Sequence, residues 1–128
     1  FSCHGSVFCF KDLPLSCVTT EMEFLLQEKD RLYTGVIDLF FKWQGKYFLV
    51  DWKSNYLGPD ADSYELCQLE KCMQENNYHT QASLYIQAAK AFLEKKEGHA
   101  DSFGGMMYIF LRGLEHKSQG VYLCQSML

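Results

Sequence analysis

The stretch TGVIDLFFKWQGKYFLVDWKSN, residues 34–55, decides the fold because it contains two strand-like segments joined by a very short turn. The segments 34–43 and 46–54 are rich in β-branched and aromatic residues, and the dipeptide Gln44-Gly45 between them is typical of a tight hairpin. Both faces of both segments are largely apolar, which predicts that the sheet is covered on both sides.

Alternation along the two segments predicts which residues share a face of the sheet. Val36 and Phe40 are expected on one face, whereas Ile37 and Leu39 are expected on the other. Helices or other layers are expected to cover each face.

The turn also predicts the register between the two segments. If the turn consists of residues 44 and 45 alone, the numbers of opposed residues sum to 89. Asp38 therefore lies directly opposite Asp51, at a non-hydrogen-bonded position where side chains approach to about 4.5–5.5 Å at Cβ. Lys53 lies on the same face, two residues beyond Asp51.

Two opposed carboxylates inside apolar strands repel each other, and one of them would retain a proton unless a cation lies between them. Ligation by oxygen alone favours Mg²⁺, with Mn²⁺ as a substitute, over zinc. Such a site predicts phosphodiester hydrolysis, with Lys53 placing a positive charge near the attacking water or the scissile phosphate. The structural alternative is that these aspartates accept backbone hydrogen bonds or pair with a lysine, and it fits Asp38 best when Asp38 is considered alone.

The rest of the chain predicts an α/β fold with a central mixed sheet and helices on both faces. Further strands are expected at residues 20–27, 104–113 and 120–125, and helices at 63–75 and 78–96. Alternation favours a strand for 20–27, whereas residue propensities favour a helix there, and we prefer the strand. Asp62 and Glu65 form a capping-box pattern at the first helix, and Gly98 follows the second helix as a C-cap.

The composition describes one domain with a sizeable core, since the chain has 128 residues of which 48% are hydrophobic. A net charge of −4 argues against a surface that binds nucleic acid by electrostatics alone, so DNA binding must depend on metal ions or partner domains. No long apolar run or signal-like segment is visible, and we expect a soluble, cytoplasmic domain without a membrane partner. Because the sequence begins at Phe1 rather than Met, we expect a fragment of a longer chain.

The six cysteines are expected to be reduced thiols, mostly buried, because no C-x-x-C pair is present and the apolar core does not need disulfides. Cys67 and Cys72 form a C-x4-C spacing that is unusual for metal ligands, so a zinc or iron–sulfur site is the minor alternative.

The segment GVIDLFFKWQGKYFLVDWKSN resembles the core of the PD-(D/E)xK nuclease superfamily, and most closely the nuclease domain at the C-terminus of the RecB-type β subunit of exodeoxyribonuclease V. The segments EMEF (21–24), YHTQASLYIQA (78–88) and FGGMMYIFLRG (103–113) resemble family segments in the same order. The resemblance spans roughly residues 20–125 and implies a restriction-endonuclease-like core.

This resemblance implies roles for the residues of the hairpin. Asp38 and Asp51 match the metal ligands of the family, and the backbone carbonyl of Trp52 completes the coordination of a metal ion. Lys53 matches the catalytic lysine. Glu21 fits a further acidic residue of the active site, with the neighbouring Glu23 as its rival, and a plain surface charge is the alternative for both.

Three residues outside the hairpin are also matched to the family. Gln81 and Tyr85 match a Q-x-x-x-Y motif, share one helix face, and are expected to orient Lys53 or to contact the DNA backbone. Tyr85 also belongs to the packing stripe of its helix, so a purely structural role is an equal alternative. Arg112 is expected at the end of the 104–113 strand, where it contacts either a DNA phosphate or an acidic side chain.

The resemblance implies a Mg²⁺-dependent deoxyribonuclease of the exodeoxyribonuclease V type. It also implies an ATP-driven helicase in the same chain and the other subunits of a RecBCD-type complex, acting on single strands or duplex ends of DNA in double-strand break repair and recombination. The metal-binding histidine that family members carry upstream, in a G-x-x-H setting, cannot be placed here, and His4 does not fit it.

Two alternatives follow from these observations. A catalytically inactive, nuclease-like module for subunit assembly or DNA guiding is favoured by the missing histidine and the acidic charge, but opposed by the retention of Asp38, Asp51 and Lys53. A stand-alone resolvase or restriction-type nuclease is opposed by the FLRG segment and the missing initiator Met.

Overall fold

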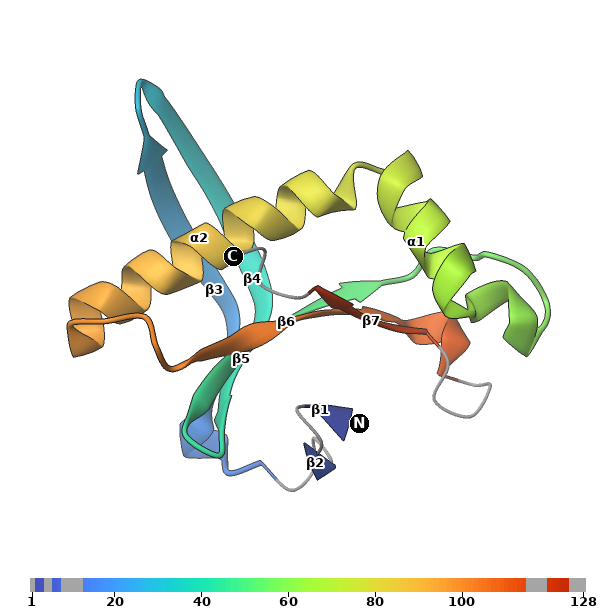
Figure 1. The fold of residues 1–128 in the computed structure, drawn as a ribbon, viewed down its shortest axis with the longest axis horizontal. Coiled ribbons are helices and arrows are strands. Elements are labelled where there is room, and N and C mark those ends of the chain that lie inside the picture. The colour runs from blue at the N-terminus through green and yellow to red at the C-terminus, as the bar shows by residue number, and fades with distance from the viewer. Residues whose placement is uncertain (1, 4–5, 8–12, 115–119, 125–128) are drawn as a thin grey trace.

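The computed structural model of the chain describes residues 2–3, 6–7, 13–114 and 120–124. Its main body is a five-stranded sheet crossed by two α-helices (Figure 1). The strands are β1 (Ser2–Cys3), β2 (Ser6–Val7), β3 (Val18–Glu28), β4 (Arg31–Trp43), β5 (Lys46–Lys53), β6 (Phe103–Phe110) and β7 (Val121–Cys124). The helices are α1 (Leu66–Glu75) and α2 (Tyr78–Glu97), and three single 3-10 turns are η2 (Leu15–Cys17), η3 (Ala61–Tyr64) and η4 (Leu111–Gly113).

The main sheet is mixed and has the strand order β3-β4-β5-β6-β7. Its neighbouring strands pair antiparallel, except that β5 and β6 are parallel. A parallel pair needs a long crossover, and the chain between β5 and β6 supplies it with α1 and α2. The predicted α/β class with a central mixed sheet is therefore confirmed.

The turn between β4 and β5 has the backbone that its sequence predicts. Gln44 has φ 49° and Gly45 has φ 76°, so both turn residues lie in the left-handed region that a tight hairpin of this type requires. The ladder runs without a shift from this turn to the pair Leu39 and Val50. The predicted register is therefore confirmed over that length.

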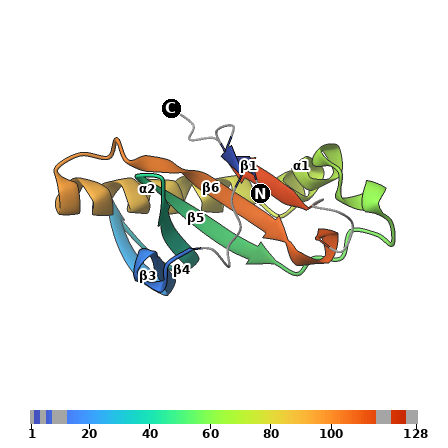
Figure 2. The ribbon, with the colours of Figure 1, turned by 90° about the horizontal axis from the view of Figure 1, so that it is seen from below.

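Apolar side chains pack on both faces of the sheet. The helix-side cluster includes Leu49, Leu69, Met73, Ala82, Ile86, Ala89, Leu93, Met106, Tyr108 and Phe110. The far-side cluster consists of Leu39, Phe41, Phe48, Val50, Met107 and Ile109, against which Leu13, Val18 and Leu114 pack. Both described helices pack on one face, and Figure 2 shows α2 behind β5 and β6. Within the described ranges, the expectation of helices on both faces is thus met on one face only, and irregular segments cover part of the other.

Beyond residue 21, β3 and β4 project past α2 as a hairpin that we call the β3–β4 arm, residues 22–37 (Figure 1). The residue just before the arm, Glu21, has a φ of 49°, which lies in the left-handed region. The ladder pairs Thr20 with Leu39 before this point and Met22 with Ile37 after it.

The change of direction at Glu21 alters which side chains face the helices. Ile37 packs in the helix-side cluster with Phe40, whereas Leu39 packs in the far-side cluster. Val36 is exposed. The prediction that Ile37 shares a face with Leu39, and Val36 with Phe40, is therefore wrong, because regular alternation does not continue through the distorted position.

The first helix begins later than predicted. The residues up to Tyr64 form the 3-10 turn η3, and α1 starts after Glu65, which is extended at ψ 160° and makes no side-chain capping bond. Tyr64 is buried, and its hydroxyl accepts a hydrogen bond from the Leu57 N–H, which ties the turn to the segment before it. The capping box of Asp62 and Glu65 is therefore wrong, whereas Gly98 is confirmed as the αL C-cap of α2.

The four cysteines with described side chains are free thiols. Cys72 is buried, Cys67 is exposed, and Cys17 and Cys124 lie between these extremes, so the expectation of mostly buried thiols is only partly met. Cys67 and Cys72 do not share an environment that would bind one metal ion. Among the helices of the described ranges, none is both long and apolar enough to cross a bilayer.

Candidate active site

Three acidic residues occupy successive register positions on β3, β4 and β5, which we call the acidic row. Continuing the β3–β4 ladder by one residue places Glu21 opposite Asp38, and continuing the β4–β5 ladder by one residue places Asp38 opposite Asp51. Glu21 is exposed, Asp38 is half-buried and Asp51 is 5% exposed. The row therefore runs from solvent into the protein interior.

Asp38 lies where the ladder between β4 and β5 ends. Its Oδ2 accepts a hydrogen bond of 2.9 Å from the backbone N–H of Trp52, the residue after Asp51. This bond holds the Asp38 carboxylate against β5, next to the backbone whose carbonyl is expected to ligate a metal ion. One part of the structural alternative for Asp38, a bond to the backbone, is thus present.

Asp51 is a buried carboxylate with an incomplete set of partners. Its Oδ2 lies 2.8 Å from Nζ of Lys53, yet among the described residues this buried atom has no hydrogen bond of acceptable geometry. Burial raises the pKa of Asp51, the neighbouring charge of Asp38 adds to this rise, and Lys53 opposes it. Lys53 therefore offsets only part of the cost of burying the ionised Asp51 carboxylate. An additional cation would stabilise its ionised form.

Lys53 is the last residue of β5, and its side chain, which is 14% exposed, extends toward α2. Besides the ion pair with Asp51, its Nζ donates a hydrogen bond of 3.2 Å to Oε1 of Gln81. Gln81 in turn donates from Nε2 to the hydroxyl of Tyr85, one helical turn further along α2, at 3.4 Å. The structure thus brings Gln81 next to Lys53, as the sequence predicted, and leaves its role in the reaction a prediction.

Tyr85 connects the site to the β3–β4 arm. Its ring meets that of Phe24 edge to face at 5.1 Å, and a Cβ on Gly35 would lie only 2.6 Å from the Phe24 ring. Burial raises the pKa of Tyr85, and the charges of Asp51 and Asp38 add to the rise. Tyr85 therefore packs the arm onto α2 and also lies within electrostatic reach of both aspartates.

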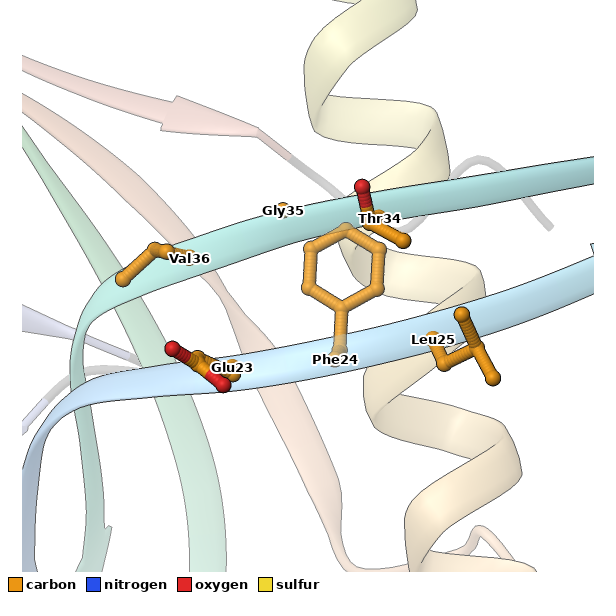
Figure 3. A pocket seen from close by; sticks show the side chains of 6 residues that line it. All are labelled: Glu23, Phe24, Leu25, Thr34, Gly35 and Val36. Carbon is orange, nitrogen blue, oxygen red and sulfur yellow. The ribbon is translucent and has the colours of Figure 1, made fainter.

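Glu23, the rival of Glu21, lies on the arm instead of in the acidic row. It pairs with Val36 and lines an open pocket of about 450 Å³ on the outer face of the arm (Figure 3). The pocket is lined by Glu23, Phe24, Leu25, Thr34, Gly35 and Val36, none of which belongs to the acidic row. The register places Glu21, and not Glu23, opposite Asp38, and the role of either residue in the site stays a prediction.

Arg112 lies in η4 and not in a strand, because β6 ends at Phe110. Its Nε donates a hydrogen bond of 2.9 Å to the carbonyl of Ser54, and its guanidinium lies 5.7 Å from the centre of the Tyr56 ring. The strand assignment is therefore wrong. Within the described ranges Arg112 makes no ion pair, and its contact with phosphate stays a prediction.

The donor set fits a hard dication, although the described residues contain no group of three or more His, Cys, Asp or Glu side chains close enough to hold a metal ion. Mg²⁺ commonly uses one or two carboxylates and takes its other oxygens from water and substrate phosphate. Asp38 and Asp51 supply that number, and Oδ2 of Asp51 is a buried oxygen without an aligned donor. The described histidines are engaged elsewhere, since His79 pairs with Glu70 and His99 with Asp101, and His4 lies outside the described residues.

Comparison with curated proteins finds several relatives named RecBCD enzyme subunit RecB. This chain is 38% identical over 114 residues to the one from Escherichia coli (strain K12), 34% over 113 residues to the one from Chlamydia trachomatis serovar D, and 41% over 92 residues to the one from Haemophilus influenzae. The alignments cover 85%, 88% and 69% of this chain but 10%, 11% and 8% of the relatives. The chain therefore spans about a tenth of the length of the curated relatives it matches. No family model matches it.

Proposed function

We propose, from the premise that this chain is a homologue of RecB subunits and matches a RecB-type nuclease domain, that it hydrolyses DNA phosphodiester bonds with a divalent metal ion. The observation that carries the proposal is the buried carboxylate of Asp51 between Asp38 and Lys53. Its placement within the PD-(D/E)xK superfamily is an inference from this set of residues.

The metal ion would be held by Asp38 and Asp51, with the carbonyl of Trp52 and the exposed carboxylate of Glu21 as further oxygen donors. When bound, Mg²⁺ or Mn²⁺ supplies a Lewis acid for the phosphoryl oxygens and lowers the pKa of a coordinated water. The proposal is supported by the register, which puts both aspartates at the same end of the β4–β5 ladder.

Lys53 would place its positive charge beside the scissile phosphate, where negative charge develops during hydrolysis. Gln81 holds the ammonium from the side of α2 through its Oε1. Tyr85 and Arg112 are the further groups that we propose to contact the DNA backbone, Arg112 through a guanidinium that has no acidic partner among the described residues.

The setting that we propose is the nuclease part of a RecB-type chain within a RecBCD-type complex. An ATP-driven helicase and partner subunits would deliver single strands or duplex ends to this site during double-strand break repair and recombination. The net charge of −4 supports dependence on such partners, since the chain lacks the basic excess of domains that grip DNA alone.

A catalytically inactive module for subunit assembly or DNA guiding is the second candidate. It is favoured because the described residues contain no group of three or more His, Cys, Asp or Glu side chains close enough to hold a metal ion, and the family's upstream histidine has no counterpart among them. Retention of Lys53 in contact with both Asp51 and Gln81 opposes it.

The test is to incubate the chain with linear single-stranded and double-stranded DNA in Mg²⁺, Mn²⁺ or EDTA. We expect cleavage that requires the metal ion and is lost in both Asp51→Ala and Lys53→Ala. Asp101→Ala removes an exposed carboxylate far along the chain from the site and should leave cleavage unchanged. Absence of cleavage together with absence of Mn²⁺ binding by the wild-type chain would favour the inactive module.

A further inference from the structure

The ammonium of Lys53 rests against two aromatic rings that the sequence did not link to it. Its Nζ lies 4.0 Å from the centre of the Tyr78 ring and 5.3 Å from that of Tyr108. Both distances lie within the roughly 6 Å over which a ring attracts a cation, and the attraction is strongest where water is excluded. With its side chain 14% exposed, Lys53 is largely shielded from water at this position.

Tyr108 fixes the amide that binds the same ammonium. It is fully buried on β6, and its hydroxyl donates to Oε1 of Gln81 at 2.8 Å and lies 3.2 Å from the carbonyl of Tyr78. Because an ammonium can only donate, the oxygen of the Gln81 amide must face Lys53, and the Tyr108 hydroxyl donates to that same oxygen. Tyr108 therefore sets the orientation in which Gln81 can accept from Lys53.

Tyr78 is itself held at both ends. Its ring stacks on that of Tyr108, with 5.7 Å between the centres and an angle of 13° between the planes. Its hydroxyl accepts a hydrogen bond of 3.2 Å from Nδ2 of Asn55, two residues beyond Lys53. The ring that faces the ammonium is thus fixed by β6 on one side and by the segment after β5 on the other.

These neutral partners matter because of where the charged partner lies. Asp51, the one carboxylate that pairs with Lys53 among the described residues, is also the carboxylate that a metal ion would occupy. An ammonium that shares its counter-ion with a dication needs other contacts to keep its place. Ring faces and an amide oxygen provide these contacts without competing for the metal ion.

We propose that Tyr78 and Tyr108 are positioning residues that hold the Lys53 ammonium at the scissile phosphate while Asp51 binds the metal ion. The inference rests on the proposed nuclease function. It assigns the face of the Tyr78 ring, and not its hydroxyl, as the contact that matters, and it assigns the hydroxyl of Tyr108 as the group that orients Gln81.

The first test compares substitutions that separate ring from hydroxyl. We expect Tyr78→Leu to lower kcat about 3- to 30-fold, since a cation–ring contact contributes from about 0.5–1 kcal/mol where it is exposed to about 2 kcal/mol where it is desolvated, and 1.36 kcal/mol is a factor of ten. Tyr78→Phe keeps the ring and should retain kcat within about twofold. KM for DNA and Kd for Mn²⁺ should stay unchanged in both. Tyr108→Phe should lower kcat about 2- to 10-fold through Gln81.

The second test observes the contact directly and does not need activity. In NMR spectra of lysine labelled at Cε, the Lys53 methylene protons should be shifted upfield by the ring in the wild type and in Tyr78→Phe, and this shift should disappear in Tyr78→Leu. Tyr47→Leu is the matched control, because Tyr47 also lies within 6 Å of lysine ammonium groups but at the other end of β5. It should leave the Lys53 signal and kcat unchanged.

The outcomes separate this inference from the proposed function. A wild-type chain that cleaves DNA, together with a folded Tyr78→Leu variant of normal kcat or a Lys53 signal without an upfield shift, overturns the positioning role alone. A wild-type chain that binds Mn²⁺ but cleaves no DNA overturns the proposed function, and the positioning role with it. If Tyr78→Leu does not fold, Tyr78→Met removes the ring in its place, and Tyr108→Phe tests separately the hydroxyl that orients Gln81.

Discussion

The two ends of β5 hold the same kinds of group in different surroundings. At the end next to the hairpin turn, which we call the turn end, the Tyr47 ring lies 5.2 Å from Nζ of Lys42 and 5.4 Å from that of Lys96, and both lysines are exposed. At the opposite end, which we call the site end, Nζ of Lys53 lies 4.0 Å from the Tyr78 ring and is largely shielded.

The comparison shows that burial, and not the identity of the residues, distinguishes a candidate site from a surface contact. An exposed cation–ring contact contributes about 0.5–1 kcal/mol because water competes for the cation, whereas a desolvated one reaches about 2 kcal/mol. Only the site end adds a buried carboxylate, Asp51, whose pKa is raised by that burial. The charges at the site end are therefore held in a largely buried network, whereas Lys42 and Lys96 at the turn end are exposed to water.

The largest difference between the two ends is expected from removing one ammonium group at each. Lys53→Met should lower cleavage in Mn²⁺ by about 100-fold or more, as removal of a group that stabilises developing charge costs roughly 2.7–4 kcal/mol. Lys96→Met at the turn end should leave cleavage unchanged. Initial rates on a labelled linear DNA measure both, and equal losses in the two variants would contradict the assignment of the site.

The next effect concerns Asp51 and pH. Because its folded pKa is raised, its contribution to stability is fully present below the ordinary value of 3.8 and is lost as pH rises through the folded pKa. The melting temperature of the metal-free wild type should therefore fall relative to that of Asp51→Asn as pH increases above 3.8. At neutral pH, Mn²⁺ at a concentration of a hundred times its Kd should raise the free energy of unfolding of the wild type by about 2.7 kcal/mol. It should not raise that of Asp51→Asn. Thermal unfolding between about pH 4 and 8 provides the measurement. If the melting temperatures of the two proteins change with pH in the same way, the raised pKa of Asp51 is contradicted.

Two glycines test whether packing near the site is coupled to activity. A Cβ on Gly35 would lie 2.6 Å from Phe24 and 3.2 Å from Tyr85, and a Cβ on Gly104 would lie 2.6 Å from Phe48 near the turn end. Gly35→Ala and Gly104→Ala should each reduce the free energy of unfolding by about 1–3 kcal/mol through overpacking. Only Gly35→Ala should also lower kcat, because it displaces Tyr85. Denaturant titration and cleavage rates, compared below the melting temperature, distinguish the two effects.

The smallest expected effect uses two strained positions. Gln44 at the turn end and Glu21 at the site end both have φ 49°, which is unfavourable for residues with a Cβ. Gln44→Gly and Glu21→Gly should each stabilise the fold by up to about 1 kcal/mol by relieving that strain. Gln44→Gly should leave cleavage unchanged, whereas Glu21→Gly should lower it because a carboxylate of the acidic row is lost. Unaltered cleavage in Glu21→Gly would remove Glu21 from the site.

The hairpin and its register could be predicted because they depend on local chemistry. A two-residue turn that ends in Gly45 sets the register of every pair up to Leu39 and Val50. The position of Asp38 opposite Asp51 then follows from this register. The position of Glu21 in the same row could be foreseen only through resemblance, since EMEF offers Glu23 two residues away.

Other features depend on contacts that the local sequence does not encode. The Ile37 side chain packs on the helix side of the sheet because the backbone is distorted at Glu21. The alternation of apolar residues does not predict this distortion. Tyr78 lies in the segment 78–88 that resembles the family, but the sequence assigns it no role. Its contact with Lys53, and that of Tyr108 with Gln81, require the parallel pairing of β5 with β6 and the position of α2 above them.

That parallel pairing also bears on the order in which the molecule folds. It brings Tyr108 beside Asp51, 57 positions earlier in the chain, whereas the β4–β5 hairpin closes over a two-residue turn. Short-range hairpins form in microseconds, and long-range parallel contacts form much later because a large loop must close first. A growing chain would thus bring its two aspartates together well before Tyr108 and Gln81 reach the lysine, so the proposed competence to cut DNA would be among the last properties that the maturing protein acquires.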